Sequence, residues 1–282
     1  MLTFDNIKSL QTALHSHKES NKKIGFVPTM GALHEGHLSL LKKAKEECEV
    51  VVVSIFVNPT QFNNPEDLEK YPRTEAIDIK LLEKEGCDIV FLPKVDEIYP
   101  KDCKTLKLDL SPLNEVMEGK HRPGHFEGVV NVVSRFFEIV QPNKAYFGRK
   151  DFQQVAIIRK MNKQLNFPIE IVSVETERSP SGLALSSRNA RLNEEQLEKA
   201  TAIYRTLIKG KTLVESNNPK ATKRKMEQYF SQSGLQLEYI EIVNPDNLLS
   251  LNQYWVPGAT ACIVAYCDDV RLIDNMELVP ND

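Results

Sequence analysis

The stretch that most constrains the fold is residues 24–41, which read IGFVPTMGALHEGHLSLL. Its apolar beginning, residues 24–27, predicts a buried strand that ends at Pro28. From Leu38 onward, apolar residues recur at the spacing of a helix that buries one face. The stretch therefore predicts a strand, a tight turn and an amphipathic helix, with polar residues gathered at the turn.

Two histidines, His34 and His37, stand in this turn. Because they are three residues apart, both imidazoles are predicted to lie on one side of the first helical turn. A helix begins with unpaired backbone N–H groups and the positive end of its dipole, and both favour an anion. Gly31 and Gly36 permit the close backbone approach that such a turn needs. We interpret the turn as a site for nucleotide phosphate.

The histidine pair has two other interpretations. A zinc site of the zincin type needs histidines four residues apart with a glutamate next to the first, and His34-Glu35-Gly36-His37 is one residue shorter. A histidine at a helix start also commonly caps the helix or faces solvent. Both alternatives stay open at this point.

Composition limits the classes of partner. The chain has 282 residues, of which 41% are apolar and 27% are charged, and its net charge is −3. This length suits two domains or one large one. Sequence-independent binding of nucleic acid would need an excess of basic residues, so we expect no nucleic-acid partner. An anionic ligand must then be met by a local group of donors.

The sequence predicts a cytoplasmic protein. No apolar run approaches the length of a membrane span, and residues 1–20 lack the pattern of a secretory signal. The five cysteines form no Cys-x-x-Cys pair. We therefore expect no membrane partner, no disulfides and no zinc knuckle, and we expect most cysteines to be buried and reduced.

Strands and helices alternate up to about residue 174. The predicted helices here are 5–18, a helix beginning near 35, 74–86, 126–140 and 152–165, and the predicted strands are 24–27, 50–57, 87–92, 145–147 and 169–174. The run 50–57, which is apolar except for Ser54, is typical of a parallel sheet covered on both faces. Residues 58–73 are rich in Asn and Pro and predict a loop at the carboxyl end of that strand. Ligands bind at this edge of an open α/β sheet, so Asn58 and Gln61 are candidate contacts, although polar loop residues are more often only solvated.

The composition changes after the loop 179–192. Charged amphipathic helices are predicted at 194–209 and 219–230, followed by strands at 237–243, 259–266 and 270–273. Helices followed by strands of antiparallel character predict a small α+β domain, joined to the first near residues 175–185.

Three clusters are predicted to meet at the ligand-binding edge: the histidine pair, residues 150–151 and residues 186–188. They suit adenylyl transfer, because charge builds on the phosphate oxygens and on departing pyrophosphate when a carboxylate attacks the α-phosphorus of ATP. Lys150 and Arg188 would supply fixed cations, and Asp151 would hold Mg²⁺ directly or through water. Simpler interpretations exist for each: an exposed charge pair, a helix cap and a flexible linker.

The strings PTMGALHEGH, FVNPTQF, YPRT, HRPGHFEGV, FGRKDFQQ and GLALSSRN occur in this order within residues 28–189. Together they resemble the pantothenate synthetase family, also called pantoate:β-alanine ligases. The H-x-G-H signature by itself is shared with class I aminoacyl-tRNA synthetases and other nucleotidyltransferases. FVNPTQF and GLALSSRN are much narrower.

The resemblance implies the fold and the activity. It implies a Rossmann-like parallel-sheet domain over residues 1–178, which binds ATP and pantoate, and a smaller α+β lid domain over residues 179–282. The implied reaction joins pantoate to β-alanine with ATP and Mg²⁺ through an enzyme-bound pantoyl adenylate, and it yields pantothenate, AMP and pyrophosphate. A homodimer is also implied.

The resemblance also assigns site residues. Those implied to contact ATP are Met30, Gly31, Ala32, Leu33, His34, Glu35, Gly36, His37, Gly148, Arg149, Lys150, Asp151, Glu177, Leu185, Ser186, Ser187 and Arg188. Those implied to be catalytic are His37 as proton donor, His34, Lys150 and Arg188, and Asp151 would bind the metal. Those implied to bind pantoate or β-alanine are Gln61 and Gln154, with Asn58, Tyr71 and Arg122 as secondary contacts.

Two positions depart from the family pattern. Glu177 stands where a small apolar residue near adenine is usual, and Ser181 replaces a frequent Asp. An inward carboxylate at Glu177 would alter nucleotide affinity, whereas a backbone contact to adenine would make its side chain unimportant. Two other functions remain as alternatives: a transferase that makes a nucleotide cofactor, and an RNA-binding relative without chemistry.

Overall fold

The computed structural model describes residues 1–63 and 65–280, and the chain packs into two compact units. Unit 1 comprises Met1–Leu110, Arg122–Arg149 and Gln154–Glu175, and unit 2 comprises Ser111–His121, Lys150–Gln153 and Thr176–Asp282. Two short segments from the first part of the sequence thus pack with the carboxyl-terminal part. The domain ranges 1–178 and 179–282 stay a prediction. Residue 64, in the predicted loop 58–73, and residues 281–282, in the predicted second domain, lie outside the described residues.

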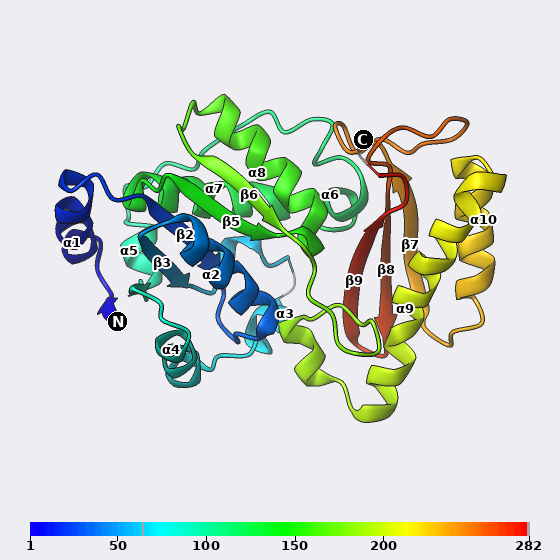
Figure 1. Cartoon of the computed structure of the whole chain (residues 1–282), viewed down its shortest axis with the longest axis horizontal. Coiled ribbons are helices and arrows are strands. Elements are labelled where there is room, and N and C mark those ends of the chain that lie inside the picture. The colour runs from blue at the N-terminus through cyan, green and yellow to red at the C-terminus, as the bar shows by residue number, and fades with distance from the viewer. Residues whose placement is uncertain (64, 281–282) are drawn as a thin grey trace. The chain divides into compact units, whose positions relative to one another are not determined.

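Unit 1 is built on a parallel sheet of six strands in the order β1-β4-β3-β2-β5-β6 (Figure 1). The strands are β1 Leu2–Phe4, β2 Ile24–Thr29, β3 Val50–Ile55, β4 Ile89–Phe91, β5 Lys144–Gly148 and β6 Glu170–Val174. From β2 the chain adds β3 and β4 on one side, and β5 and β6 lie on the other. The order therefore reverses between β2 and β5, and in sheets of this kind ligands bind outside the carboxyl ends of the two strands at such a reversal.

Helices cover both faces of this sheet. The helices of this part are α1 Ile7–Glu19, α2 Glu35–Glu47, α3 Pro65–Glu69, α4 Glu75–Lys84, α5 Val95–Ile98, α7 His125–Val140 and α8 Phe152–Gln164, with 3₁₀ turns η1 Pro59–Gln61 and η2 Arg149–Asp151. On one face, Leu41 of α2 shares a buried cluster with Val27 of β2. On the other face, the Phe136 ring of α7 contacts Phe26 and Phe91. Adjacent residues of β2 thus serve opposite layers, as strand geometry requires.

Unit 2 contains an antiparallel sheet of three strands in the order β7-β8-β9, in agreement with the predicted α+β class. Its elements are α6 Met117–His121, η3 Ser187–Arg191, α9 Glu194–Leu213, η4 Val214–Ser216, α10 Pro219–Phe230, β7 Gln236–Val243, β8 Thr260–Cys267 and β9 Val270–Glu277. The core packs Leu207 of α9 and Met226 of α10 against Ile240 and Ile263 of the sheet. In the described part of the chain, no helix is long and apolar enough to cross a membrane.

The structure departs from the sequence prediction at several short elements. The predicted loop 58–73 contains η1 and α3, because Asn58 and Thr60 form a side-chain-capped turn that begins with Pro59. Strand β1 and helices α5 and α6 have no counterpart in the prediction. Strand β9 continues to Glu277, beyond the predicted end at residue 273, because it stays paired with β8 as far as Glu277, opposite Thr260.

Candidate functional site

A buried carboxylate shapes the turn that follows β2. Asp78 of α4 is 1% exposed, and its carboxylate accepts hydrogen bonds from Ala32 N and Leu33 N, both at 2.9 Å. Thr74 donates its hydroxyl to the same carboxylate at 3.1 Å. Gly31 and Ala32 have positive φ angles of 78° and 50°, so the turn needs this external support. Sequence reasoning missed Asp78, which lies far from the turn along the chain.

The two histidines cap helix α2. His34 Nδ1 accepts a hydrogen bond from Gly36 N at 3.1 Å, and His37 Nδ1 accepts one from His34 N at 3.4 Å. The imidazole rings lie 4.2 Å apart between centroids. Because both Nδ1 atoms accept, the neutral form of each ring carries its proton on Nε2. The imidazoles thus take over backbone N–H groups that were expected to meet the anion, and they offer Nε2–H donors in exchange.

The zinc interpretation receives no support from the described residues. Among residues 1–63 and 65–280, no group of three or more His, Cys, Asp or Glu side chains is placed to hold a metal ion. Both histidines also use Nδ1 to cap the helix. Capping and phosphate binding are compatible, because they use different ring nitrogens.

Asn58 and Gln61 form a buried polar pair after β3. Asn58 Nδ2 donates to Gln61 Oε1 and to Gly128 O, each at 3.1 Å, and Gln61 Nε2 lies 3.2 Å from Met30 Sδ. Tyr99 donates its hydroxyl to Asn58 Oδ1 at 2.9 Å, and burial raises the pKa of this tyrosine. The structure therefore brings Asn58, Gln61 and the turn at Met30 together.

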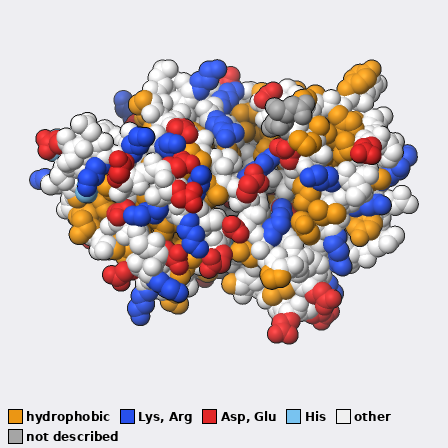
Figure 2. Space-filling view, viewed as in Figure 1, with side chains coloured by type: hydrophobic (Ala, Val, Ile, Leu, Met, Phe, Trp, Pro, Cys, Tyr) orange, Lys and Arg blue, Asp and Glu red, His pale blue; other side chains and the backbone are white. Residues whose placement is uncertain are grey.

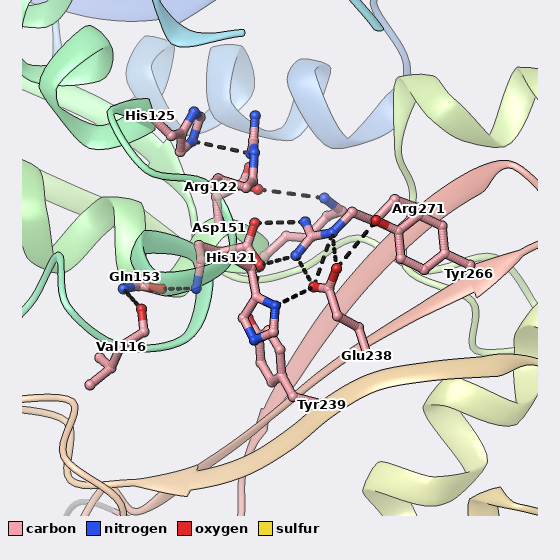
Figure 3. Close-up of polar contacts among 12 residues, drawn as sticks. Val116, His121, Arg122, His125, Asp151, Gln153, Glu238, Tyr239, Tyr266 and Arg271 are labelled. Atoms are coloured by element: carbon pink, nitrogen blue, oxygen red, sulfur yellow. Dashed lines mark hydrogen bonds and ion pairs between the residues drawn. The ribbon is translucent and has the colours of Figure 1, made fainter. Parts of the chain in front are cut away.

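Arg122 and His125 approach the backbone of the same segment. His125 is 7% exposed, and its Nδ1 lies 2.8 Å from Gln61 O. Since a carbonyl only accepts, Nδ1 carries the proton, and the neutral ring accepts at Nε2 from Arg122 Nη1 at 3.2 Å (Figure 3). His125 was missed, although it stands three residues after Arg122 in the string HRPGHFEGV.

The remaining candidates of unit 1 differ in their surroundings. Tyr71 is 6% exposed and packs edge-on against Phe62, with 5.6 Å between ring centroids. Gln154 lies half-buried in the first turn of α8. Gly148 ends β5, and Arg149 pairs with Glu175 at 2.7 Å. Tyr71 thus packs against an aromatic neighbour, while Gln154 and Gly148 lie at the edge where β5 ends.

Lys150 and Asp151 belong to unit 2. Lys150 Nζ and Asp151 Oδ1 are 3.6 Å apart, and the two side chains are 17% and 45% exposed. Asn275 Nδ2 donates to Lys150 O at 2.8 Å. One carboxylate suits Mg²⁺ that arrives with ATP, because this ion takes its other ligands from phosphate and water.

The segment 177–188, also in unit 2, forms a hairpin and then a 3₁₀ turn. Arg178 pairs with Ala184 as an isolated bridge, and Leu185 N donates to Glu177 O at 2.9 Å. Ser186 caps η3 by accepting from Arg188 N at 3.2 Å. The Glu177 side chain is exposed, so Glu177 contributes to the hairpin through its backbone carbonyl. Ser181 is exposed and contacts Ser179 at 2.8 Å between hydroxyl oxygens.

The candidate residues therefore fall into two groups. Unit 1 holds those of the turn after β2, of the segment after β3 and of the end of β5; these are Met30 to His37, Asn58, Gln61, Tyr71, Arg122, Gly148, Arg149 and Gln154. Unit 2 holds Lys150, Asp151, Glu177, Leu185, Ser186, Ser187 and Arg188.

Comparison with known proteins gives one consistent family. The model of the family described as pantoate-beta-alanine ligase matches residues 2–277. The pantothenate synthetase of Cytophaga hutchinsonii is 47% identical over 99% of this chain and 100% of its own length, and that of Phocaeicola vulgatus is 50% identical over 98% and 99%.

Solved structures agree. The pantothenate synthetase of Thermus thermophilus has a TM-score of 0.93 and 41% identity, covering 99% of this chain and 100% of that one. The pantoate-beta-alanine ligase of Francisella tularensis, in complex with beta-gamma ATP and beta-alanine, has a TM-score of 0.83 and 38% identity, covering 99% and 98%.

Proposed function

Because the chain belongs to the pantoate–β-alanine ligase family, whose reaction is the ATP-dependent condensation of these two substrates, we propose how its residues perform it. The pantoate carboxylate attacks the α-phosphorus of ATP, a new P–O bond forms, and pyrophosphate leaves. The neutral amine of β-alanine then attacks the adenylate carbonyl, loses a proton and expels AMP. Adenylation replaces a poor acyl leaving group by a good one.

The histidine pair is the observation that carries this proposal. His34 and His37 both direct Nδ1 to backbone N–H groups, so both carry the Nε2 proton, and both stand where the strand order reverses. Donors fixed in this way need no reorganisation as negative charge develops. His37 would donate to the phosphates as adenylate forms, and His34 would hold the adjacent oxygens.

The pantoate site would be built from the segment after β3. Both the side-chain amide and the backbone carbonyl of Gln61 are held by neighbouring groups. The side chain can therefore present one donor and one acceptor in a fixed orientation to a hydroxy acid. Gln154 would complete this pattern, and Arg122 would meet a substrate carboxylate. Asn58 and Tyr71 would support the pocket through buried contacts.

The phosphates of ATP would be held by cations and hydroxyls of unit 2. Lys150 and Arg188 would neutralise charge on the α-phosphate and on pyrophosphate, and Ser186 and Ser187 would donate hydroxyls. Mg²⁺ neutralises phosphate charge when it is bound, and Asp151 would contribute its carboxylate. The further ATP contacts would come from Met30, Gly31, Ala32, Leu33, Glu35, Gly36, Gly148, Arg149, Leu185 and the backbone of Glu177.

We also propose that the enzyme is a cytoplasmic homodimer. All five cysteines are free, which suits a reducing compartment. Sedimentation equilibrium tests the assembly: a mass near twice 32.1 kDa is expected, and a mass near 32.1 kDa at micromolar concentration would exclude the dimer.

Exchange of labelled pyrophosphate into ATP tests the adenylate route. We expect exchange that needs pantoate and Mg²⁺ but not β-alanine, because adenylation precedes the attack of the amine. The full reaction should form AMP and pyrophosphate. Formation of ADP and phosphate would exclude this route and indicate an acyl phosphate instead.

A further inference from the structure

Strand β9 carries two adjacent buried polar residues that the proposed reaction does not use. Asp274 and Asn275 are 4% and 5% exposed. Burying such groups costs free energy unless hydrogen bonds compensate for lost water, so their partners indicate what they do. Because successive side chains of a strand point to opposite faces, the two residues serve different faces of the sheet.

Asn275 forms a hydrogen bond to the turn that contains Lys150. Its Nδ2 donates to Lys150 O at 2.8 Å, and its own backbone N–H donates to Asp274 Oδ1 at 2.8 Å. Fixing this carbonyl fixes the peptide between Lys150 and Asp151. This peptide joins Lys150, which is proposed to meet phosphate, to Asp151, which is proposed to meet Mg²⁺.

A second contact from the same face of β9 supports the far end of this turn. Arg271 donates to both oxygens of Glu118 at 2.7 Å. It also donates to Glu238 at 2.5 Å (Figure 3). Glu118 N in turn donates to Gln153 Oε1 at 2.9 Å. Burial lowers the pKa of Arg271, but the two carboxylates outweigh it and raise this pKa above its ordinary value. Residues 150–153 are thus held at both ends.

Asp274 accepts hydrogen bonds from the hairpin that leads to Ser186. It accepts from Arg178 Nη1 at 2.6 Å and from Nη2 at 3.0 Å, and Arg178 Nη1 also donates to Gly182 O at 3.1 Å. The guanidinium lies 4.8 Å from the centre of the Tyr204 ring. Burial raises the pKa of Asp274, and Arg178 opposes this rise. Bidentate geometry of this kind fixes orientation as well as distance.

We propose that Asn275 and Asp274 are positioning residues for adenylation. Asn275 holds the turn of Lys150 and Asp151, while Asp274 acts through Arg178 on the loop of Ser186 to Arg188. The proposal rests on the function proposed above for these two segments. Its consequence is that one strand sets the spacing between the cations that grip the phosphates.

A crossed set of variants tests the assignment. Asn275→Ala and Asp274→Asn are each made in the wild-type, Lys150→Ala and Arg188→Ala backgrounds, and single-turnover adenylation is measured. In the wild-type background each should lower the rate roughly 10- to 100-fold, because small misplacements of a catalytic group have effects of this size. Asn275→Ala should lose most of its effect in the Lys150→Ala background and keep it in the Arg188→Ala background. Asp274→Asn should show the reverse.

Two further variants separate positioning from stability. Ile273→Val lies on the same face of β9 as Asn275 and controls for mild destabilisation of the strand. Its adenylation rate should stay within about twofold of the wild-type rate. Arg178→Lys keeps a positive charge beside Asp274 but loses the bidentate contact, so it substitutes for Asp274→Asn if that variant does not fold. Losses of equal size in every background would show a general structural role and overturn the proposal. Wild-type enzyme without pantoate-dependent exchange would instead refute the proposed function.

Discussion

At the scale of single residues, the site depends on side chains whose amide and ring atoms are fixed by neighbouring groups. Gln61 shows this clearly: its Oε1 accepts from Asn58, its Nε2 contacts Met30, and its carbonyl accepts from His125. A side chain fixed in this way loses little rotamer entropy when it binds substrate. The same holds for His34 and His37 at the start of α2.

We predict that Gln61→Ala and Gln154→Ala weaken pantoate binding and leave ATP binding nearly intact. Each truncation leaves a pantoate hydroxyl or carboxylate without its partner, which costs about 1–3 kcal/mol. Pantoate and ATP affinities measured by calorimetry check this. Gln164→Ala, an exposed glutamine on the same helix as Gln154, is the control. Equal weakening for both substrates would contradict the assignment.

At the scale of elements, the face of the molecule in Figure 2 mixes charges of both signs. Helix α7 and the turn η1 meet without space for a side chain at Gly128. A Cβ there would lie 2.5 Å from Thr60 O and 2.7 Å from Gln61 Cα. This close approach is what lets Asn58 reach the Gly128 carbonyl.

Gly128→Ala is therefore predicted to displace η1 together with Gln61. Overpacking of this kind costs about 1–3 kcal/mol, so both the melting temperature and the pantoate affinity should fall. Glu127→Ala, an exposed change on the same helix, should alter neither. A Gly128→Ala enzyme with wild-type melting temperature and pantoate affinity would show that the helix and the turn adjust freely.

Glu47 links the end of α2 to β5 and should make stability depend on pH. Hydrogen bonds from Lys144 and Lys43 lower the pKa of Glu47 from 4.5 to about 2. Because the folded pKa is depressed, the contribution is complete above pH 4.5 and is lost as the pH falls from 4.5 to about 2. Urea unfolding across this range should show a shallower loss of stability for Glu47→Gln than for wild type. With Glu46→Gln as control, identical slopes for Glu47→Gln and wild type would refute this contribution.

At the scale of the whole molecule, two of the proposed donors to ATP come from different parts of the chain. His37 belongs to unit 1 and Lys150 to unit 2. His37→Ala and Lys150→Ala should each slow adenylation about 10²–10³-fold, since each removes a donor to developing charge. Given prepared pantoyl adenylate, both variants should form pantothenate with a smaller loss, because pyrophosphate has already left.

Single-turnover rates measure the two steps separately. The exposed His15→Ala is the control for loss of an imidazole. If both steps fell equally in His37→Ala with unchanged fold and adenylate affinity, His37 would not act specifically on ATP activation.

The sequence by itself determined the family and most of the longer elements. Apolar runs such as 50–57 predicted a covered parallel sheet, and the turn with His34 and His37 was recognisable from short-range spacing. These features depend on neighbours within a few residues, so they can be read locally. The motifs then supplied most of the candidate residues.

Only the tertiary structure decided which distant residues hold the site in place. Asp78 lies 45 residues from Leu33, and Asn275 lies 125 residues from Lys150, so no local pattern joins them. In sequence, buried polar residues such as Asp274 resemble solvated ones, which is why β9 was predicted too short. The physical reason is that a polar side chain becomes structural only when folding removes it from water and supplies a partner.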